Sequence, residues 1–503
     1  MGFKAILMVS LIGLAAPLSA QADTPFTISD IKAAHSVSEL KLVRFFAADN
    51  QALVVKGRTD AGNRIFSFYE MQEGNALAVT PSVAVTMPDD ALFYDFASVF
   101  DTGQESLLFL NDVGVQRFDP TTDSFEPFIA LTSIYRQNSS PLFEQMDFAR
   151  DLNGDGYADI IVPDFDGYWL RLNDGEGGFH SQILLDMQVE MRLSQGRPLY
   201  SQFPLHSSDV NFDGKPDILF QKDQSFIVFH QLLDGSFDTK PVEYDIDIDV
   251  IGNSFSEFVR SNERYEDQSD LVETRIVSVE DINGDDVIDI VTETDRAKGL
   301  FDRSTTYQFH YGAEADGKLM FNSEPSANVT LKGVTARNRY LDFTDDGRKD
   351  FVGGSVNIGI GKIIGILLSG SVGIHVNFYE QGADGSFGEK PTFRKKVSVD
   401  FDMSSGQSSV PVAEMLDIDG DKAKDMVISK DNDELRIYYA TPGGKNMFRK
   451  KEVKLKIDLP RNGELVSVED VNGDDKGDLL IHFDRLGADG TENKNRFLVL
   501  IAN

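Results

Sequence analysis

The sequence predicts an all-β fold, a single β-propeller of four-stranded blades. An Asp-rich loop recurs along the 503-residue chain, and each full copy leads into a short apolar run. Further runs of Ile, Val, Leu, Phe and Tyr follow, separated by Gly, Asp and Asn turns. No long capped helical period is present beyond the N-terminal segment. Short strands in a large repeating unit are typical of propeller blades.

The composition excludes several classes of function. The 82 acidic and 48 basic residues give a formal net charge of -34, so the surface repels nucleic-acid phosphate and anionic lipid. The absence of cysteine excludes disulfides, thiolate metal sites, cysteine nucleophiles and a lipid-modified N-terminal cysteine. Clustered acidic residues remain compatible with cation binding.

Residues 1–22 are predicted to be a secretory signal peptide. Lys4 supplies a positive region, Ala5 to Ala16 is apolar, and Ala20-Gln21-Ala22 is a small-x-small cleavage site. The alternative, an uncleaved anchor, would need about 20 apolar residues. Cleavage leaves a propeller domain of residues 23–503, exported to a bacterial periplasm or the extracellular space, with no further membrane-spanning segment.

Eight repeat units are predicted, starting near residues 41, 92, 145, 205, 275, 338, 412 and 464. The first unit, with a strand-like segment from Leu42 to Val55, has lost its loop ligands, and the loop of the second, 98–106, has decayed. A turn followed by Phe recurs downstream of the loops, at Phe125, Phe179, Phe237, Phe321, Phe387 and Phe448. The Asp-rich loop and the turn before Phe recur together, which argues against a chance similarity between the units.

The last unit is predicted to borrow a strand from the N-terminus. It has strand-like runs near 478–483 and 496–501, after which the chain ends without an outer strand. The segment 24–29 is strand-like and belongs to no other unit. We expect it to complete the last blade, which would close the ring and leave no open sheet edge there.

The six full loops are predicted to be calcium sites, about six in number. Positions 1, 3, 5 and 9 carry Asp, Asn or Thr, and position 7 can offer its backbone carbonyl. Calcium takes six to eight oxygen ligands in flexible geometry. The predicted ligands are Asp151, Asn153, Asp155, Tyr157 and Asp159; Asp209, Asn211, Asp213, Lys215 and Asp217; Asp281, Asn283, Asp285, Val287 and Asp289; Asp342, Thr344, Asp346, Arg348 and Asp350; Asp417, Asp419, Asp421, Ala423 and Asp425; Asp470, Asn472, Asp474, Lys476 and Asp478.

The loops differ from EF-hands, because strand-like runs flank them and no Glu stands at position 12. Position 6 is Gly in three loops, which allows a positive φ. Asp286, Lys422 and Asp475 stand there in the others and must adopt the turn at some strain. A repeat of Asx turns without an ion is the alternative interpretation.

The loop pattern, Asp-x-Asn-x-Asp-Gly-x-x-Asp before an apolar strand with a Gly-Ser-Phe turn downstream, resembles the FG-GAP/VCBS repeat family over residues 90–480. This family includes integrin α-chain propellers and many exported bacterial proteins. The resemblance implies a calcium-stabilised propeller with ligands at loop positions 1, 3, 5, 7 and 9. Seven blades are common in the family, so seven remain possible beside the eight counted. Its members include adhesion receptors, lectins and polysaccharide lyases, so it implies no single activity.

Two insertions lengthen the repeat. Residues 241–274 are acidic, and they are either a solvated loop or a lid over one face. Residues 354–374 lie within a stretch, 351–379, whose single formal charge is Lys362. That stretch is either a buried hairpin or plug, or an exposed apolar patch for a partner or membrane surface.

Three classes of function remain open. The first is a calcium-binding adhesion or scaffold protein of the cell envelope or extracellular space, with a protein or glycan ligand. The second is a carbohydrate-active protein, a lectin or polysaccharide lyase, and the third is a structural subunit of an envelope assembly. No residue is predicted to be catalytic, since nucleophile-elbow, zincin and phosphate-loop motifs are missing. His230, His310 and His375 share a repeat position, which explains them more simply than a metal cluster does.

Overall fold

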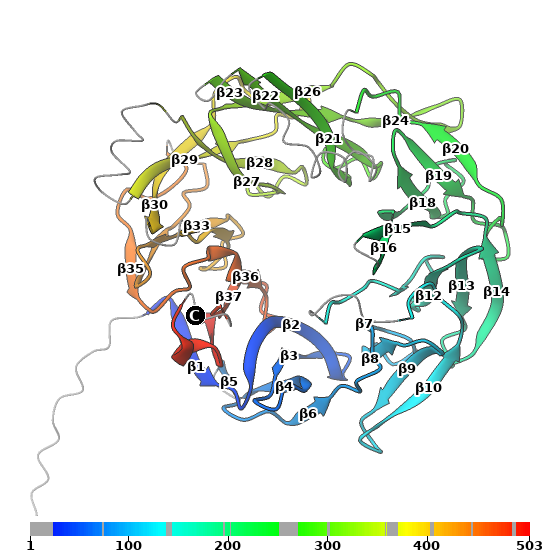
Figure 1. Cartoon of the computed structure of the whole chain (residues 1–503). Helices are drawn as coiled ribbons and strands as arrows, with labels where there is room; N and C mark the ends of the chain where they lie inside the picture. Colours follow the sequence, from blue (N-terminus) through cyan, green and yellow to red (C-terminus); the bar gives the residue numbers. More distant parts are fainter. Residues whose placement is uncertain are drawn as a thin grey trace, which may run out of the picture.

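The computed structural model describes residues 24–72, 75–136, 143–194, 197–201, 203–250, 270–298, 302–357, 359, 371–402, 407–443, 446–484 and 489–503. Eight antiparallel sheets follow one another around a ring (Figure 1). The all-β prediction and the count of eight blades are therefore confirmed, and seven blades are excluded. The predicted signal peptide and most of both insertions, 251–269 and 360–370, lie outside the described residues.

The first four blades have these strands. Blade 1 contains β2 (Ser36–Ala47), β3 (Asn50–Arg58), β4 (Arg64–Gln72), β5 (Ala76–Leu77) and β6 (Val83–Thr86). Blade 2 contains β7 (Phe93–Ala97), β8 (Ser106–Leu110), β9 (Gly114–Asp119) and β10 (Ser124–Ala130). Blade 3 contains β11 (Ala149–Arg150), β12 (Asp159–Asp164), β13 (Gly167–Asn173) and β14 (Phe179–Leu185), followed by the hairpin β15 (Glu190–Ser194) and β16 (Arg197–Ser201). Blade 4 contains β17 (Leu205–Ser208), β18 (Asp217–Lys222), β19 (Ser225–Phe229) and β20 (Val242–Asp245).

The other four blades complete the ring. Blade 5 contains β21 (Asp270–Glu280), β22 (Asp289–Lys298), β23 (Asp302–His310) and β26 (Ala327–Lys332), with the hairpin β24 (Gly312–Ala315) and β25 (Lys318–Phe321). Blade 6 contains β27 (Val334–Leu341), β28 (Asp350–Val356), β29 (Ser371–Tyr379), β30 (Phe393–Asp402) and β31 (Gln407–Ser408). Blade 7 contains β32 (Ala413–Leu416), β33 (Asp425–Lys430), β34 (Glu434–Tyr438) and β35 (Val453–Lys456). Blade 8 contains β36 (Val466–Glu469), β37 (Asp478–His482), β38 (Arg496–Ala502) and β1 (Phe26–Lys32), with 3-10 turns η1 (Gly463–Leu465) and η2 (Thr491–Asn493) nearby in the chain.

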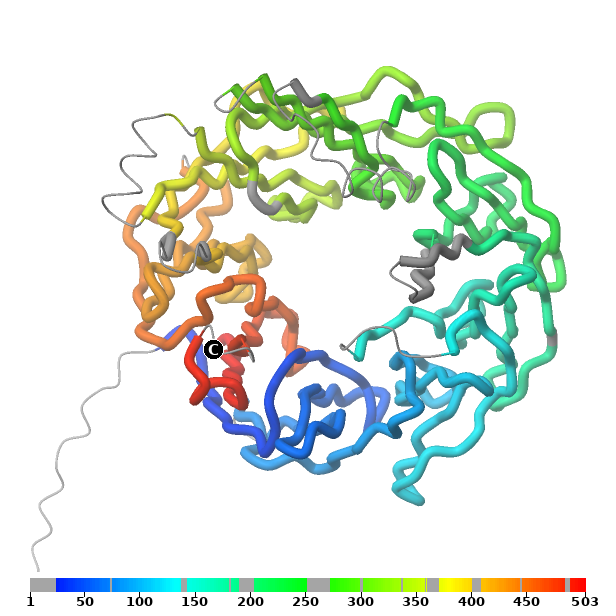
Figure 2. The backbone as a smooth tube through the Cα atoms, viewed as in Figure 1, coloured from blue at the N-terminus to red at the C-terminus, as the bar shows by residue number. Residues whose placement is uncertain are grey.

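The N-terminal strand closes the ring, as the sequence predicts. β1 pairs antiparallel with β38, in a register that runs from Phe26 opposite Ala502 to Lys32 opposite Arg496. Figure 2 shows the N-terminal strand, in blue, beside the red C-terminal strand. Blade 8 thus combines both ends of the described chain and has its full set of four strands.

The alternating strand directions divide the connections between two faces of the ring. Connections from first to second strand and from third to fourth strand emerge on one face, which carries the Asp-rich loops and is here called the Asp-loop face. Second-to-third connections and blade-to-blade connections emerge on the other, here called the crossover face. The three longest connections, β20–β21, β14–β17 with its β15–β16 hairpin, and β10–β11, begin and end on the crossover face, as does the β28–β29 connection that contains the second predicted insertion.

The hydrophobic core consists of eight layers, one between each pair of adjacent blades. The recurrent Phe residues extend several of these layers. Phe448 of blade 7 packs on Phe393 of blade 6, with ring centroids 4.9 Å apart, and Phe387 of blade 6 packs on Phe309 of blade 5 at 4.6 Å. The repeated Phe is therefore a contact between neighbouring blades, which explains why it recurs with the loops.

Candidate functional site

The six predicted loops share one hydrogen-bond pattern, set by the Asp at position 1. In every loop its Oδ2 accepts the backbone N–H of position 6, over 2.7 to 3.0 Å. The position-5 carboxylate accepts the N–H of position 7 over 2.9 to 3.1 Å. Each loop thereby winds its chain tightly around its own oxygen atoms, at the turn between first and second strands of blades 3 to 8.

The Asp at position 9 joins the loop to the rest of its blade. All six of these residues, Asp159, Asp217, Asp289, Asp350, Asp425 and Asp478, are buried. In each, Oδ2 accepts the N–H of loop position 2. Its Oδ1 accepts an N–H at the end of the third strand, over 2.7 to 2.9 Å. One buried carboxyl group therefore bridges three segments of the blade.

Burial also changes the acidity of these groups. It raises the pKa of Asp159, Asp289 and Asp425 to about 7, against the opposing effect of the backbone N–H groups that they accept. It raises the pKa of Asp350 and Asp478 to about 6. A cation bound in the loop would favour the ionised carboxylates and offset this cost of burial.

Positive φ angles occur at two loop positions. Position 6 has φ between 64° and 92° in all six loops, including Asp286, Lys422 and Asp475, so the strained turn predicted for these residues is confirmed. Position 4 also has positive φ throughout, which the sequence analysis missed. Phe212, at 57°, occupies this position in blade 4 and is unfavourable there because its side chain is bulky.

The blade 7 loop brings three acidic side chains close together. Carboxylate oxygens of Asp417, Asp419 and Asp425 all lie within 4.8 Å of one another. Burial and the neighbouring Asp421 raise the pKa of Asp419, while the guanidinium of Arg449, 3.5 Å from its Oδ2, counteracts this. Three converging hard oxygen donors fit calcium chemistry.

Two other loops depart from the pattern. In blade 6 the Thr344 hydroxyl donates to Asp350 over 3.2 Å, and Arg348 pairs with Asp346, so protein groups already engage both acids. In blade 4 the His230 Nδ1 lies 3.1 Å from Asp217 Oδ2. The shared repeat position of the histidines did not predict this contact. His310 differs, since its Nδ1 lies 2.9 Å from the Asn322 carbonyl oxygen.

The position-3 amides complete the four loops that contain Asn there. Each amide oxygen accepts the position-5 N–H, and each amide nitrogen donates to the position-5 carboxylate. The loop positions predicted from the sequence are thus brought together at one turn in each of blades 3 to 8. The role of the position-7 carbonyl stays a prediction.

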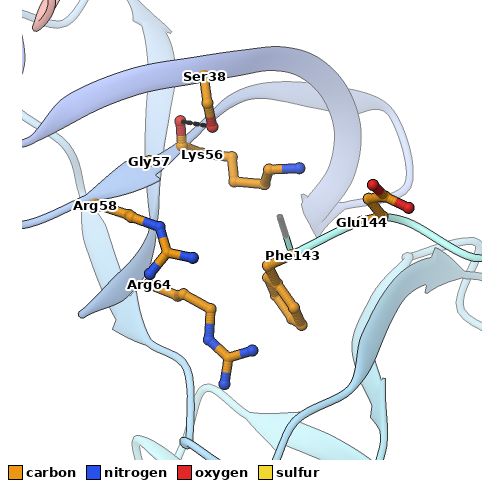
Figure 3. Close-up of a pocket in the computed structure, with 7 residues that line it drawn as sticks. All are labelled: Ser38, Lys56, Gly57, Arg58, Arg64, Phe143 and Glu144. Carbon is orange, nitrogen blue, oxygen red and sulfur yellow. Dashed lines mark hydrogen bonds between the residues drawn. The ribbon is translucent and has the colours of Figure 1, made fainter. Parts of the chain in front are cut away.

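The crossover face has pockets that the sequence analysis did not find. One, of about 290 Å³, lies where blade 1 meets the segment leading into blade 3, and it is lined by Lys56, Arg58, Arg64, Phe143 and Glu144 among others (Figure 3). A second, of about 230 Å³, lies between blades 3 and 4 and has an aromatic lining that includes Tyr168, Phe203 and Phe220. The segment 143–150 contributes residues to both pockets.

Comparison with known proteins finds only distant structural similarity. No family model and no curated protein matches the chain. Among solved structures, a lectin of Agrocybe aegerita that recognises non-reducing terminal N-acetylglucosamine is 17% identical, with a TM-score of 0.40 over 85% of this chain and 92% of that chain. The biofilm matrix protein Bap1 of V. cholerae is 10% identical, with a TM-score of 0.28 over 96% of this chain and 92% of that chain. Similarities of this size carry no argument about ligands.

Within the described residues, no helix has the length and apolar character needed to span a membrane.

Proposed function

We propose that the chain is an exported, calcium-binding β-propeller of the FG-GAP/VCBS type that acts as a binding or adhesion protein of the cell envelope or extracellular space. One observation carries the proposal. The same oxygen-rich turn recurs on the Asp-loop face of six successive blades, while the three longest connections between blade strands, β20–β21, β14–β17 and β10–β11, begin and end on the opposite face. Long loops on a rigid scaffold commonly carry binding.

Calcium has a structural role in this proposal. An ion in each loop would neutralise clustered carboxylates and hold the turn whose position-9 Asp bridges the blade. Because the folded loops bind the ion and the unfolded chain does not, calcium would stabilise the fold by mass action. The crossover face would then remain available for a protein or glycan ligand.

The test is the metal content and melting temperature of residues 23–503, before and after chelation. About six calcium ions and a large fall in melting temperature on chelation are expected. Asp155→Ala removes an exposed position-5 carboxylate of blade 3 and should remove about one ion. Asp49→Ala changes an exposed Asp at the corresponding turn of blade 1 and serves as the matched control. No bound calcium and an unchanged melting temperature would leave the loops as Asx turns and overturn the calcium role.

Export has its own test. The N-terminal residue of the protein recovered from the producing cells should be Asp23. A chain that retains residues 1–22 and stays in the cytoplasm would contradict the proposed location.

A further inference from the structure

Two basic runs of identical sequence lie side by side on the outer rim of blades 6 and 7. Phe393-Arg394-Lys395-Lys396 opens β30, and Phe448-Arg449-Lys450-Lys451 leads into β35. The rings of Phe393 and Phe448 contact each other across the blade boundary, with their centroids 4.9 Å apart, so both runs start from one point. Figure 1 shows β30 and β35 as neighbours at the outside of the ring. The fold thereby gathers cations from two blades on one surface.

This part of the rim is basic, although the protein is acidic. Residues 390–399 contain four basic and no acidic residues, and residues 446–457 contain five basic residues and one acidic residue. The outer strands of the six other blades, β1, β6, β10, β14, β20 and β26, contain only two basic residues, Lys32 and Lys332. A surface that reverses the sign of the surrounding protein attracts an anion. We call this surface the basic rim, and it consists of Lys390, Arg394, Lys395, Lys396, Arg449, Lys450, Lys451, Lys454 and Lys456.

Most charges of the basic rim have no neutralising partner. Arg394 donates to the amide oxygen of Asn377 over 2.9 Å, and the Lys395 ammonium lies 3.5 Å from the centre of the Tyr438 ring. Both partners are uncharged, so these contacts hold the side chains without cancelling their charge. In the described part of the chain, no ion pair or side-chain hydrogen bond engages five exposed lysines, Lys390, Lys396, Lys450, Lys451 and Lys456.

Two residues of the basic rim are paired with acids. A guanidinium nitrogen of Arg449 lies 3.5 Å from Asp419 Oδ2, and the Lys454 ammonium lies 3.7 Å from Glu452 Oε1. The side chains of Arg449 and Lys454 are 54% and 52% exposed. Exposed ion pairs of this kind are weak, so an external anion can compete for both cations.

The other acids of the adjoining segments do not cancel the excess of positive charge. Glu434 stands opposite Lys456 on β34, but it pairs with Arg436 of its own strand over 2.9 Å. The connection that precedes Lys390 contains the three remaining acids, Glu380, Asp384 and Glu389. With Arg436 included, ten basic residues stand against six acids, so the surface remains positive.

The form of the basic rim favours a polymer over a small anion. Neither pocket of the crossover face includes any of its residues. Seven of its nine cations are lysines, which lack the rigid fork by which arginine holds a single carboxylate or phosphate. Side chains on the same side of a strand are about 6.5–7 Å apart, so Arg394 and Lys396 present a row of charges rather than a converging cluster.

The charge of the whole chain selects among polymers. A net charge of -34 repels a dense polyanion, and duplex nucleic acid carries one charge for about every 1.7 Å of its axis. A glycan with one carboxylate per sugar ring has more widely spaced charges and is repelled less. An exported protein meets the glycans of the envelope or extracellular space, so the choice of a glycan rests on the export proposed above.

We propose that the basic rim binds a linear glycan that carries one carboxylate per sugar ring, with its carboxylates spread along the two Arg-Lys-Lys runs. The basic rim lies on the outside of blades 6 and 7, apart from the pockets of the crossover face. It therefore adds a second binding surface, with a stated class of ligand, to the function proposed above.

The test is fluorescence anisotropy of a labelled oligogalacturonate titrated with residues 23–503, without added calcium and with a labelled malto-oligosaccharide as the neutral control. The oligogalacturonate should bind at least about tenfold more tightly. Its affinity should fall about tenfold between about 50 and 200 mM salt, because salt screens exposed charges.

Paired lysine variants locate the binding. Lys450→Gln combined with Lys451→Gln should weaken oligogalacturonate binding about three- to tenfold, because two exposed charge contacts are lost. Lys240→Gln combined with Lys318→Gln removes two exposed lysines of blades 4 and 5 and should leave binding unchanged. Equal melting temperatures of the variants would show that loss of binding is not loss of folding.

Several outcomes would overturn the proposal. These are no binding of the oligogalacturonate, equal binding of the malto-oligosaccharide, or equal losses in the two double variants. Tighter binding of an oligonucleotide or an oligoglutamate of equal charge would assign the basic rim to another polymer. A dimer in light scattering that disappears in the Lys450→Gln, Lys451→Gln variant would make the surface an interface between copies. Export is tested separately, so a cytoplasmic chain that binds oligogalacturonate after purification would contradict the location alone.

Discussion

Arg496 donates to both carboxylate oxygens of Asp30, a residue 466 positions away in the chain. Its Nε lies 2.8 Å from Asp30 Oδ1 and its Nη2 lies 2.7 Å from Oδ2. Its remaining nitrogen, Nη1, lies 2.8 Å from Asp458 Oδ2, so one guanidinium links β1 and β38 to the end of blade 7. The closure of the ring is thus held by charge as well as by the β1–β38 ladder.

Asp30→Asn should weaken this closure by about 1 kcal/mol, the usual scale for a well-aligned but exposed ion pair. The hydrogen bond from Arg496 lowers the pKa of Asp30 below its ordinary value. The contribution is therefore full at neutral pH and is lost as pH falls through the lowered pKa. Urea unfolding at pH 7 measures the loss. Asp60→Asn, an exposed acid 3.4 Å from Lys494, should have no effect, and an equal effect of the two variants would contradict the assignment.

Asp95 should make the protein less stable as pH rises. It is buried and accepts the Ala149 N–H over 3.0 Å and the Gln145 amide over 2.8 Å, and burial raises its pKa to about 7. Since this lies above the unfolded value of about 3.9, the folded chain binds more protons between those pH values. The free energy of unfolding contributed by Asp95 therefore falls as pH rises from about 4 to 7.

Asp95→Asn should remove this part of the pH dependence, because an amide does not titrate. Denaturant unfolding of both proteins from pH 4 to 8 measures the difference between their free energies of unfolding. The contribution of the Asp loops is the same in both proteins, so it cancels in this difference. The variant should gain stability relative to the parent as pH rises. If the free energies of unfolding of the two proteins change in parallel with pH, Asp95 does not titrate in this range.

Lys422→Gly should stabilise the chain by about 1 kcal/mol, because Lys422 holds φ at 71° and glycine adopts this conformation without a side-chain clash. Its side chain is exposed, so little packing is lost. Lys424→Gly, two residues along, has no positive φ to relieve and should destabilise the chain by about 0.5–1 kcal/mol. The two changes in unfolding free energy should have opposite signs, and a shared sign would count against strain at position 6.

Phe448→Ala should cost about 3–5 kcal/mol, the usual range for deleting a buried Phe. The ring is 5% exposed and packs on Phe393 and Phe378 of the preceding blade, so the loss should fall on the contact between blades 6 and 7. Phe165→Ala removes a ring that is 62% exposed and should change stability little. Similar costs for both would show that the recurrent Phe is not an inter-blade contact.

The sequence predicts much of this architecture because each repeat unit is recognised from residues that lie close together in the chain. These are the Asp-rich loop, the apolar run that follows it and the turn before Phe. The eight units, the strand that closes blade 8 and the strained position 6 all follow from turn chemistry and counting. Strand starts are less well placed, since β2 begins at Ser36 and not near residue 41, and β21 begins at Asp270 and not near residue 275. The Asp-rich loop marks where a first strand ends, and no motif marks where it begins.

Other features depend on contacts that no local pattern carries. Phe212 adopts a positive φ, which is unfavourable for Phe, because the geometry of the Asp-rich loop requires it at this position. Arg58, Arg64 and Phe143 meet only when blade 1 packs beside the chain that leaves blade 2. The pairing of His230 with Asp217 likewise depends on how the third strand ends beside the loop. Side chains that are distant in the sequence come together only when neighbouring blades pack against each other in the ring.

The split origin of blade 8 also fixes the order in which the protein can be completed. During synthesis the segment Phe26–Lys32 is made before all the other described strands, and its partner strand Arg496–Ala502 is made after them. Seven blades can therefore assemble while β1 has no hydrogen-bonding partner and the seam stays open. A chain that stops short of β38 would expose an unpaired strand and an unfinished blade to proteases and to other chains.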